Sequence, residues 1–227
     1  QFHQNQAQWP AQVQFRATTP GGALFVEPSA FTHVLVRGGE QGVHGKAGAV
    51  PEPFRMHAYR VHFAGATGGV AHGVGKEPHY VNYFLGSDPA HWASGVPVYG
   101  GVELDEVYPG IDLHVTGEHG LKYDWVVAPG ADPHRIALLF DGADQLVLSD
   151  GALRVKTTAG DVIEQRPVAW QEVGGARVPV AVAYDLEGNT LRYALPKGHD
   201  ARYPLVIDPV VVFCSYSGSS APNYGTT

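Results

Sequence analysis

Residues 107–133 constrain the fold more than any other stretch, because apolar and polar residues alternate on both sides of a short polar break at 117–120. Successive side chains of a strand point to opposite faces, so the pattern predicts a β-hairpin with one buried face. The other face would carry Asp112, Lys122 and Asp124. We take this hairpin as the centre of an all-β domain. Its two apolar rows are Ile111, Leu113 and Val115, and Leu121, Tyr123, Trp125 and Val127.

Composition favours many short strands over long helices. The 227-residue chain has 29 glycines, 17 prolines and only 16% charged residues, whereas exposed helix faces need more Lys, Glu and Arg. A hydrophobic content of 44% can fill a large core without disulfides. We therefore predict an antiparallel β-sandwich of many short strands with at most one short helical turn, at Pro89, where Ser87 or Asp88 would be the N-cap.

Alternating segments separated by Gly, Pro, Asn and Asp continue along the whole chain. Residues 38–53 and 64–78 are rich in glycine, and we expect both to be surface loops. Residues 1–212 would form one large domain, with a subdivision near residue 95 as the alternative, and residues 213–227 would begin a following repeat or linker. The expected strands are 12–16, 23–27, 31–37, 55–63, 98–104, 136–140, 146–148, 153–155, 162–170, 178–187, 191–195 and 203–213.

Net charge, cysteine content and hydropathy limit the partners and locations that the chain can have. A formal charge of −7 and a pI near 5.9 argue against nucleic acid as a partner. Cys214 is the one cysteine, so an intramolecular disulfide is excluded and the compartment is left open. The sequence has no apolar run of about 18 residues, so we expect no membrane span.

Several motifs follow one another in a fixed order. They are FHQNQAQW at 2–9, NYFLGSDP at 82–89 with Trp92, VYPGIDL at 107–113, Tyr123-Asp124 with PGADP at 129–133, QRP at 165–167 with Gln171, and PLVIDP at 204–209. This set resembles the N-terminal domain of large bacterial surface proteins that carry SBBP β-propeller-type repeats or gliding-motility-associated C-terminal modules. Residues 213–220 resemble the segment through which such proteins enter their first repeat.

The resemblance implies a location and a role. It implies export to the extracellular surface of a Gram-negative bacterium of the Bacteroidetes type, by type IX secretion, and an adhesive or scaffold function. It supplies no catalytic residues. Two positions depart from the family pattern: Ala7 stands where glycine is common, which puts a tight turn near residue 7 in question, and Cys214 stands where serine is common.

Histidines and acidic residues are the candidates for chemistry. A zinc site needs three or four converging ligands, but His57 and His62 would face opposite ways on one strand. The spacing therefore favours scattered histidines without a metal site. Acidic residues near the hairpin could form a carboxylate pair for glycoside hydrolysis or, in the 141–144 turn, bind calcium; ordinary turn formation is favoured. The histidines are His57, His62, His72, His79 and His91; the acidic residues are Asp105, Glu106, Asp112, Asp124, Asp132, Asp141 and Asp144.

Other catalytic patterns are missing from the sequence. No Gly-x-Ser-x-Gly elbow occurs, and Cys214 lies in an apolar stretch typical of inert packing. Five aromatic residues between 80 and 99 could stack on sugars, although the pattern favours core packing. They are Tyr80, Tyr83, Phe84, Trp92 and Tyr99.

These observations lead to a non-enzymatic extracellular structural or adhesion module without catalytic, cofactor or metal residues, calcium being the one cofactor left open. Its expected partners are the other domains of the same surface protein, a second copy through edge strands, or extracellular glycans. The alternatives are a carbohydrate-binding module that uses the aromatics of 80–99, and a metal-assisted hydrolase.

Overall fold

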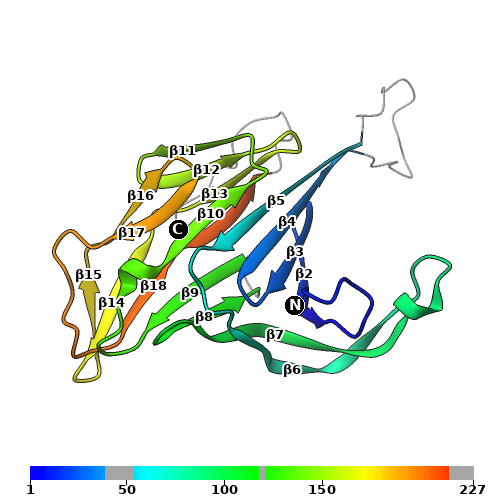
Figure 1. Ribbon diagram of the computed structural model, residues 1–227, viewed down its shortest axis with the longest axis horizontal. Coiled ribbons are helices and arrows are strands. Elements are labelled where there is room, and N and C mark those ends of the chain that lie inside the picture. Colours follow the sequence, from blue (N-terminus) through cyan, green and yellow to red (C-terminus); the bar gives the residue numbers. More distant parts are fainter. Residues whose placement is uncertain (39–53, 118–120, 215–227) are drawn as a thin grey trace, which may run out of the picture.

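The computed structural model describes residues 1–38, 54–117 and 121–214, and it is an all-β protein (Figure 1). Every strand pairing in this part of the chain is antiparallel, and the helical content is two single 3₁₀ turns, η1 (Pro89–His91) and η2 (Pro133–Arg135). The predicted antiparallel β-sandwich is thus confirmed. None of the described helices is long and apolar enough to cross a membrane.

The first layer is built mainly from the N-terminal strands, each paired with the next. They are β1 (Phe2–Gln4), β2 (Phe15–Thr19), β3 (Gly22–Glu27), β4 (Ala30–Arg37) and β5 (Arg55–Phe63). Three strands from later in the chain extend this layer beyond β5. They are β10 (Ala137–Asp141), β17 (Thr190–Ala194) and β16 (Ala183–Glu187), in that spatial order.

The second layer is centred on a meander of four strands, β6 (Val70–Tyr83), β7 (Ala93–Tyr108), β8 (Ile111–Thr116) and β9 (Leu121–Val127). Two short strands share the far side of β9, namely β18 (Leu205–Asp208) and β19 (Val210–Cys214). From β18 the sheet continues to β14 (Val168–Val173) and β15 (Ala176–Val180), and from β19 to β13 (Asp161–Glu164), β12 (Ala152–Lys156) and β11 (Gln145–Ser149). Pairing of β1 with β7 joins the two layers.

The core forms around the predicted hairpin. Leu113 of β8 lies opposite Trp125 of β9, and both side chains are fully buried. The Trp125 ring packs edge-on against Phe63 of the first layer at 5.4 Å between centroids. Because buried apolar area contributes roughly 25 cal/mol per Å², these contacts between layers hold the sandwich together. Asp112, Lys122 and Asp124 lie half-buried on the outer face, as predicted.

The predicted glycine-rich loop at 64–78 is largely wrong, because β6 begins at Val70. Gly73 lies directly beneath the Tyr99 ring of β7, and a Cβ added there would come within 2.4 Å of that ring. A glycine in a strand often marks such a close approach. Gly73 therefore allows an aromatic ring to cover the strand. The other predicted loop, apart from Gly38, lies outside the described residues, as does 215–227.

Strand ends differ from prediction where proline or a change of layer intervenes. Strand β1 is not anticipated, and the strand predicted at 12–16 begins at Phe15. The predicted strand 162–170 is divided at Pro167 into β13 and β14, because proline cannot donate to a ladder. The stretch 178–187 is divided as well: β15 pairs with β14 in one layer and β16 with β17 in the other.

The helical turn expected at Pro89 is confirmed, and Asp88 is its N-cap. The Asp88 carboxylate accepts a hydrogen bond from the Ala90 backbone N–H at 3.0 Å. Where at most one helical turn was expected, the structure has a second, η2, with the same Asp-Pro combination and with Asp132 accepting from the His134 N–H at 3.0 Å. Both turns follow from a capping carboxylate before a proline in the first helical position.

Candidate functional site

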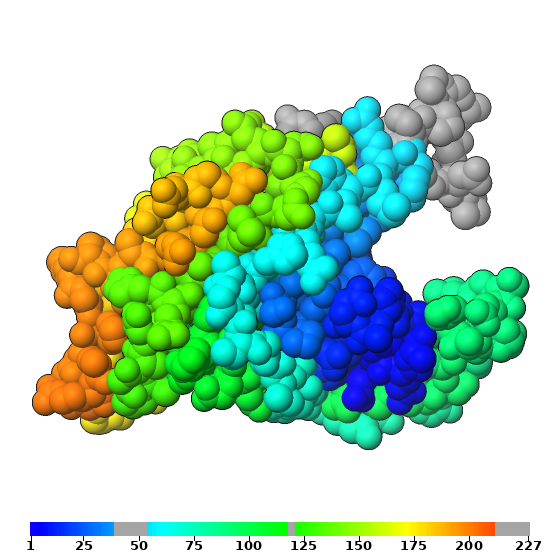
Figure 2. Space-filling model, viewed as in Figure 1, coloured from blue at the N-terminus to red at the C-terminus, as the bar shows by residue number. Residues whose placement is uncertain are grey.

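Strands β6 and β7 form an arm whose outer end projects beyond the rest of the sandwich (Figure 1, right). Strand β1 pairs with β7 only at Val98 and Tyr99, and β8 reaches no farther than Gly101. Residues 93–97 of β7 therefore have β6 as their one strand partner among the described residues. In the space-filling view the end of the arm stands apart from the main body beside the N-terminal segment (Figure 2).

The N-terminal segment packs against the arm near its outer end, where β6 finishes at Tyr83. Tyr83 of β6 is hydrogen-bonded to the His3 side chain, and its ring packs edge-on against Trp9 at 5.1 Å between centroids. Farther out, His91 Nδ1 lies 3.3 Å from the carbonyl oxygen of Ala7. The arm is thus held against the body close to its outer end, and the large apolar side chains beside these contacts stay exposed.

The tip carries four large apolar side chains, which we call the arm-tip patch: Tyr80, Phe84, Leu85 and Trp92, exposed by 65%, 57%, 70% and 42%. Phe84 and Trp92 pack edge-on at 5.8 Å, and the Trp92 indole N–H donates to the Gly86 carbonyl at 3.3 Å. The core packing favoured by the sequence is wrong for Tyr80, Phe84 and Trp92, because the rest of the molecule covers other side chains of the arm but not these. Tyr99, nearer the body, does pack against the core.

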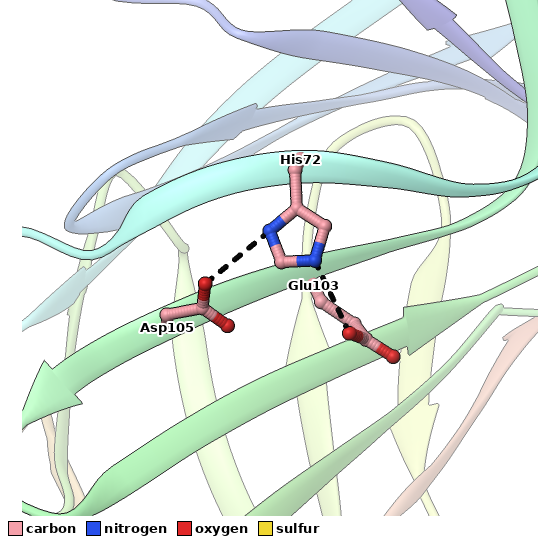
Figure 3. Close-up of side chains that lie close together, drawn as sticks. All are labelled: His72, Glu103 and Asp105. Carbon is pink, nitrogen blue, oxygen red and sulfur yellow. Dashed lines mark ion pairs between the residues drawn. The ribbon is translucent and has the colours of Figure 1, made fainter.

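A polar cluster lies on the outer face of the same strands. His72 of β6, Glu103 of β7 and His114 of β8 occupy directly paired positions and form one row. His72 Nε2 lies 3.3 Å from Glu103 Oε2, and His114 Nε2 lies 4.0 Å from Glu103 Oε1. His72 Nδ1 lies 3.4 Å from an oxygen of Asp105 (Figure 3). We call His72, Glu103, Asp105 and His114 the outer-face cluster.

Of the histidines singled out in the sequence, only His72 belongs to this cluster. His57 contacts the Thr158 hydroxyl at 2.9 Å and the Gly142 carbonyl at 2.7 Å, and His91 lies beside Asp88 on the arm. His114 and Glu103 were missed, because spacing along the chain does not show which strands pair. Once β6, β7 and β8 are aligned in register, the row is evident.

The acidic residues mostly form turns, as the sequence favours. Asp112 accepts from the Glu106 N–H at 2.7 Å, and Glu106 accepts from the Gly110 N–H at 3.1 Å. In the 141–144 turn, Gly142 has a φ of 85°, and the Asp144 N–H donates to the Lys156 carbonyl at 3.0 Å. Asp105 and Asp124 are exceptions, because the first faces His72 and the second lies in β9 beside Lys122.

One of the buried carboxyls, that of Glu164, lies among tyrosine side chains of the core. Glu164 of β13 is 4% exposed and accepts a hydrogen bond from the Tyr123 hydroxyl at 2.8 Å and a longer one from Tyr184 at 3.5 Å. Burial raises the pKa of Glu164 to about 7, opposed by these two hydrogen bonds. Sequence reasoning did not single out this residue. Its place two positions after the buried Val162 is the signal that points inward.

The fold and its exposed groups define a β-sandwich module with a projecting arm, an apolar tip and a polar outer face. The chain belongs to a protein family described as a domain of unknown function, DUF7948, and the match covers residues 2–210. No curated protein and no solved structure matches the chain.

Proposed function

We propose that this chain is a non-enzymatic structural and adhesion module, the N-terminal domain of a larger surface protein exported by a Gram-negative bacterium. The observation that carries the proposal is the arm-tip patch. Exposed Trp, Tyr and Phe side chains on a rigid support are the groups that dominate contact energies at protein interfaces. Phe84, Leu85 and Trp92 lie together on a hairpin braced by Trp9, so they can insert into a partner surface with little loss of conformational freedom.

The burial of Glu164 and the turn roles of two surface aspartates argue against catalysis by these carboxyls. Glu164, whose carboxyl has the most strongly raised pKa among the described carboxyls, is enclosed by Tyr123 and Tyr184, so a substrate does not reach it. On the surface, Asp112 and Asp132 are engaged in turns. A carboxyl enclosed in the core and aspartates that form turns are what a scaffold with a contact surface needs.

The place in a surface protein is supported by the family resemblance of the sequence. The match to the family ends at residue 210, within the last sandwich strand, and residues 213–220 resemble the entry to a repeat. Other domains of the same protein are therefore its first expected partners. Strands β6, β11, β15 and β16 each pair on one side only in the described part of the chain, and such edges could also add a strand from a second copy.

The test compares two double variants with the unchanged chain. In F84S/W92S the arm-tip patch is reduced, and V168S/V178S removes two exposed apolar side chains of β14 and β15 as a matched control. Beads coated with each protein are washed under flow over polystyrene, over a biofilm matrix and over a lawn of the same protein. Adhesion should fall for F84S/W92S alone, with circular dichroism unchanged. Equal adhesion of F84S/W92S and the unchanged chain would overturn the proposal.

A carbohydrate-binding module is the second candidate, because Tyr80 and Trp92 are exposed aromatic rings of the kind that stack on sugars. Pull-down with insoluble cellulose, chitin and starch tests it. Retention that is lost in Trp92→Ala and Tyr80→Ala would favour this function over protein contacts. Retention unaffected by Trp92→Ala, or no retention on any of the three, would count against it.

A further inference from the structure

We propose that His72, Glu103 and His114 bind one divalent transition-metal ion such as Zn²⁺, and that Asp105 is a positioning residue for His72. The site goes beyond the proposed adhesive function, since it lies on the outer face of the sandwich and shares no residue with the arm-tip patch. It rests on the strand register, on the distances between side chains and on the kinds of atom that face one another.

The register places the three side chains in one row. His72 is paired with Glu103, and Glu103 with His114, so the two histidines flank the glutamate on neighbouring strands. Ligand atoms of His72 and Glu103 already lie within 4.8 Å of one another, whereas the His114 imidazole, on the next strand about 4.8 Å away, must turn toward β7 to reach a shared ion. The two carboxylate oxygens of Glu103 already face the two Nε2 atoms, at 3.3 Å and 4.0 Å.

Asp105 provides a second and independent indication that His72 is a metal ligand. Its carboxylate lies 3.4 Å from His72 Nδ1, on the side of the ring away from Glu103 (Figure 3). An Nδ1–H that donates to this carboxylate leaves Nε2 as the nitrogen that would exchange its proton for an ion placed between it and Glu103. A carboxylate behind a histidine in this way is the usual support of a metal-binding imidazole. An ordinary surface ion pair does not need it.

The donor atoms select the class of metal. Two imidazole nitrogens and one carboxylate suit zinc and its neighbours, whereas calcium prefers six to eight oxygen ligands. All four side chains are partly exposed, so water can complete the coordination. An open position of this kind could also accept a carboxylate or imidazole from another molecule.

The test is titration of the metal-free full chain with ZnCl₂ by calorimetry at micromolar protein. One site should be observed, and Glu103→Gln and His114→Asn should each weaken it by at least about tenfold. Asp105→Asn should weaken binding by roughly 10- to 100-fold without removing the site, as expected for a positioning residue. His79→Asn, a change of another exposed histidine of β6, is the matched control and should leave the affinity unchanged.

A second measurement separates metal binding from a general effect on the fold. In nitrogen-15 spectra of the histidine rings, zinc should shift Nε2 of His72 and of His114, and His72 should carry its proton on Nδ1. Excess calcium should not displace the zinc. Equal affinity of Glu103→Gln and the unchanged chain, shifts at other histidines only, or tighter binding of calcium than of zinc would each overturn the assignment.

Discussion

At Ala7 the chain makes a turn whose backbone conformation is unfavourable for a residue with a side chain. Its φ of 79° lies in the left-handed region, where glycine is the favoured residue. The Asn5 side chain maintains the turn: its oxygen accepts from the N–H groups of Ala7 and Trp9, and its amide donates to the Val13 carbonyl at 2.8 Å. The turn that the departure from glycine puts in question is therefore present.

Replacing Ala7 by glycine should stabilise the protein. Relief of the left-handed strain exceeds the greater freedom that glycine has in the unfolded chain, so we expect a gain of about 0.5–1 kcal/mol in the free energy of unfolding. Urea denaturation measures it. Ala11→Gly, in the same loop but without a positive φ, is the control and should be neutral or destabilising. A loss of stability in Ala7→Gly would show that the turn is not strained.

Glu164 makes the stability of the fold depend on pH. The unfolded chain releases this proton near pH 4.5, whereas the folded chain keeps it up to about pH 7. The stabilisation of the folded state by the protonated Glu164 carboxyl is thus complete below pH 4.5, and it is lost as the pH rises to 7. Burial also lowers the pKa of His33 to about 3, so His33 destabilises the fold as the pH falls below about 6.5. The two groups act in opposite directions.

Glu164→Gln should therefore remove one of the two pH effects. Relative to this variant, the unchanged chain should lose about 3 kcal/mol of unfolding free energy between pH 4.5 and pH 8, which is the shift from 4.5 to about 7 expressed as energy. The His33 contribution cancels in the difference. Glu187→Gln, an exposed control, should follow the unchanged chain. Parallel profiles for the unchanged chain and Glu164→Gln would contradict the assigned shift.

At the scale of strands, alternation predicts faces but not partners. The rows of β8 and β9 were predictable because every inward position is apolar, and the Pro89 turn because Asp88 precedes a proline. Strand β6 was not, since the reason for Gly73 is the Tyr99 ring on another strand. The outer-face cluster was missed for the same reason: His72 and His114 are 42 residues apart in the numbering and meet only through the register of β7.

The junction of β9 with β18 and β19 depends on one lysine. Lys122 Nζ lies 2.7 Å from Asp208 and 3.4 Å from Asp124, where the chain leaves β18 and enters β19 at Pro209. Burial and the nearby Asp208 charge raise the pKa of Asp124, and the Lys122 charge opposes both. Without the lysine, the buried carboxylate of Asp208 and the half-buried one of Asp124 would face each other.

Lys122→Met should accordingly destabilise the fold at neutral pH. Because Lys122 is partly exposed, we expect a loss of about 1–3 kcal/mol at pH 7, less than for a fully buried pair. The loss should shrink near pH 4.5, because the pKa of Asp124 is raised and this carboxyl can take up a proton there. Urea denaturation at both pH values measures it, with Lys156→Met on β12 as the exposed control. A loss that is the same at both pH values would indicate packing rather than charge as its cause.

At the scale of the whole molecule, the two layers share strands from both halves of the sequence. Strands β10, β16 and β17 complete the layer begun by β1 to β5, and β1 in turn pairs with β7 of the other layer. A division at residue 95 would fall inside β7, and Phe63 and Trp125, from different layers and different sides of that division, are packed together. Such an arrangement favours the prediction of one cooperative domain.

Unfolding should consequently be a single transition. Loss of either half exposes the apolar face of the other, so fragments 1–95 and 96–212 should not fold when made separately. Far-ultraviolet circular dichroism follows the strands, and fluorescence of Trp125, isolated in a variant whose other tryptophans are replaced by phenylalanine, follows the contact between layers. The two signals should change together in urea, with coincident midpoints. Separate midpoints, or a fragment with its own cooperative transition, would instead establish two domains with a boundary near residue 95, and the contact of Phe63 with Trp125 would then be an interface between them.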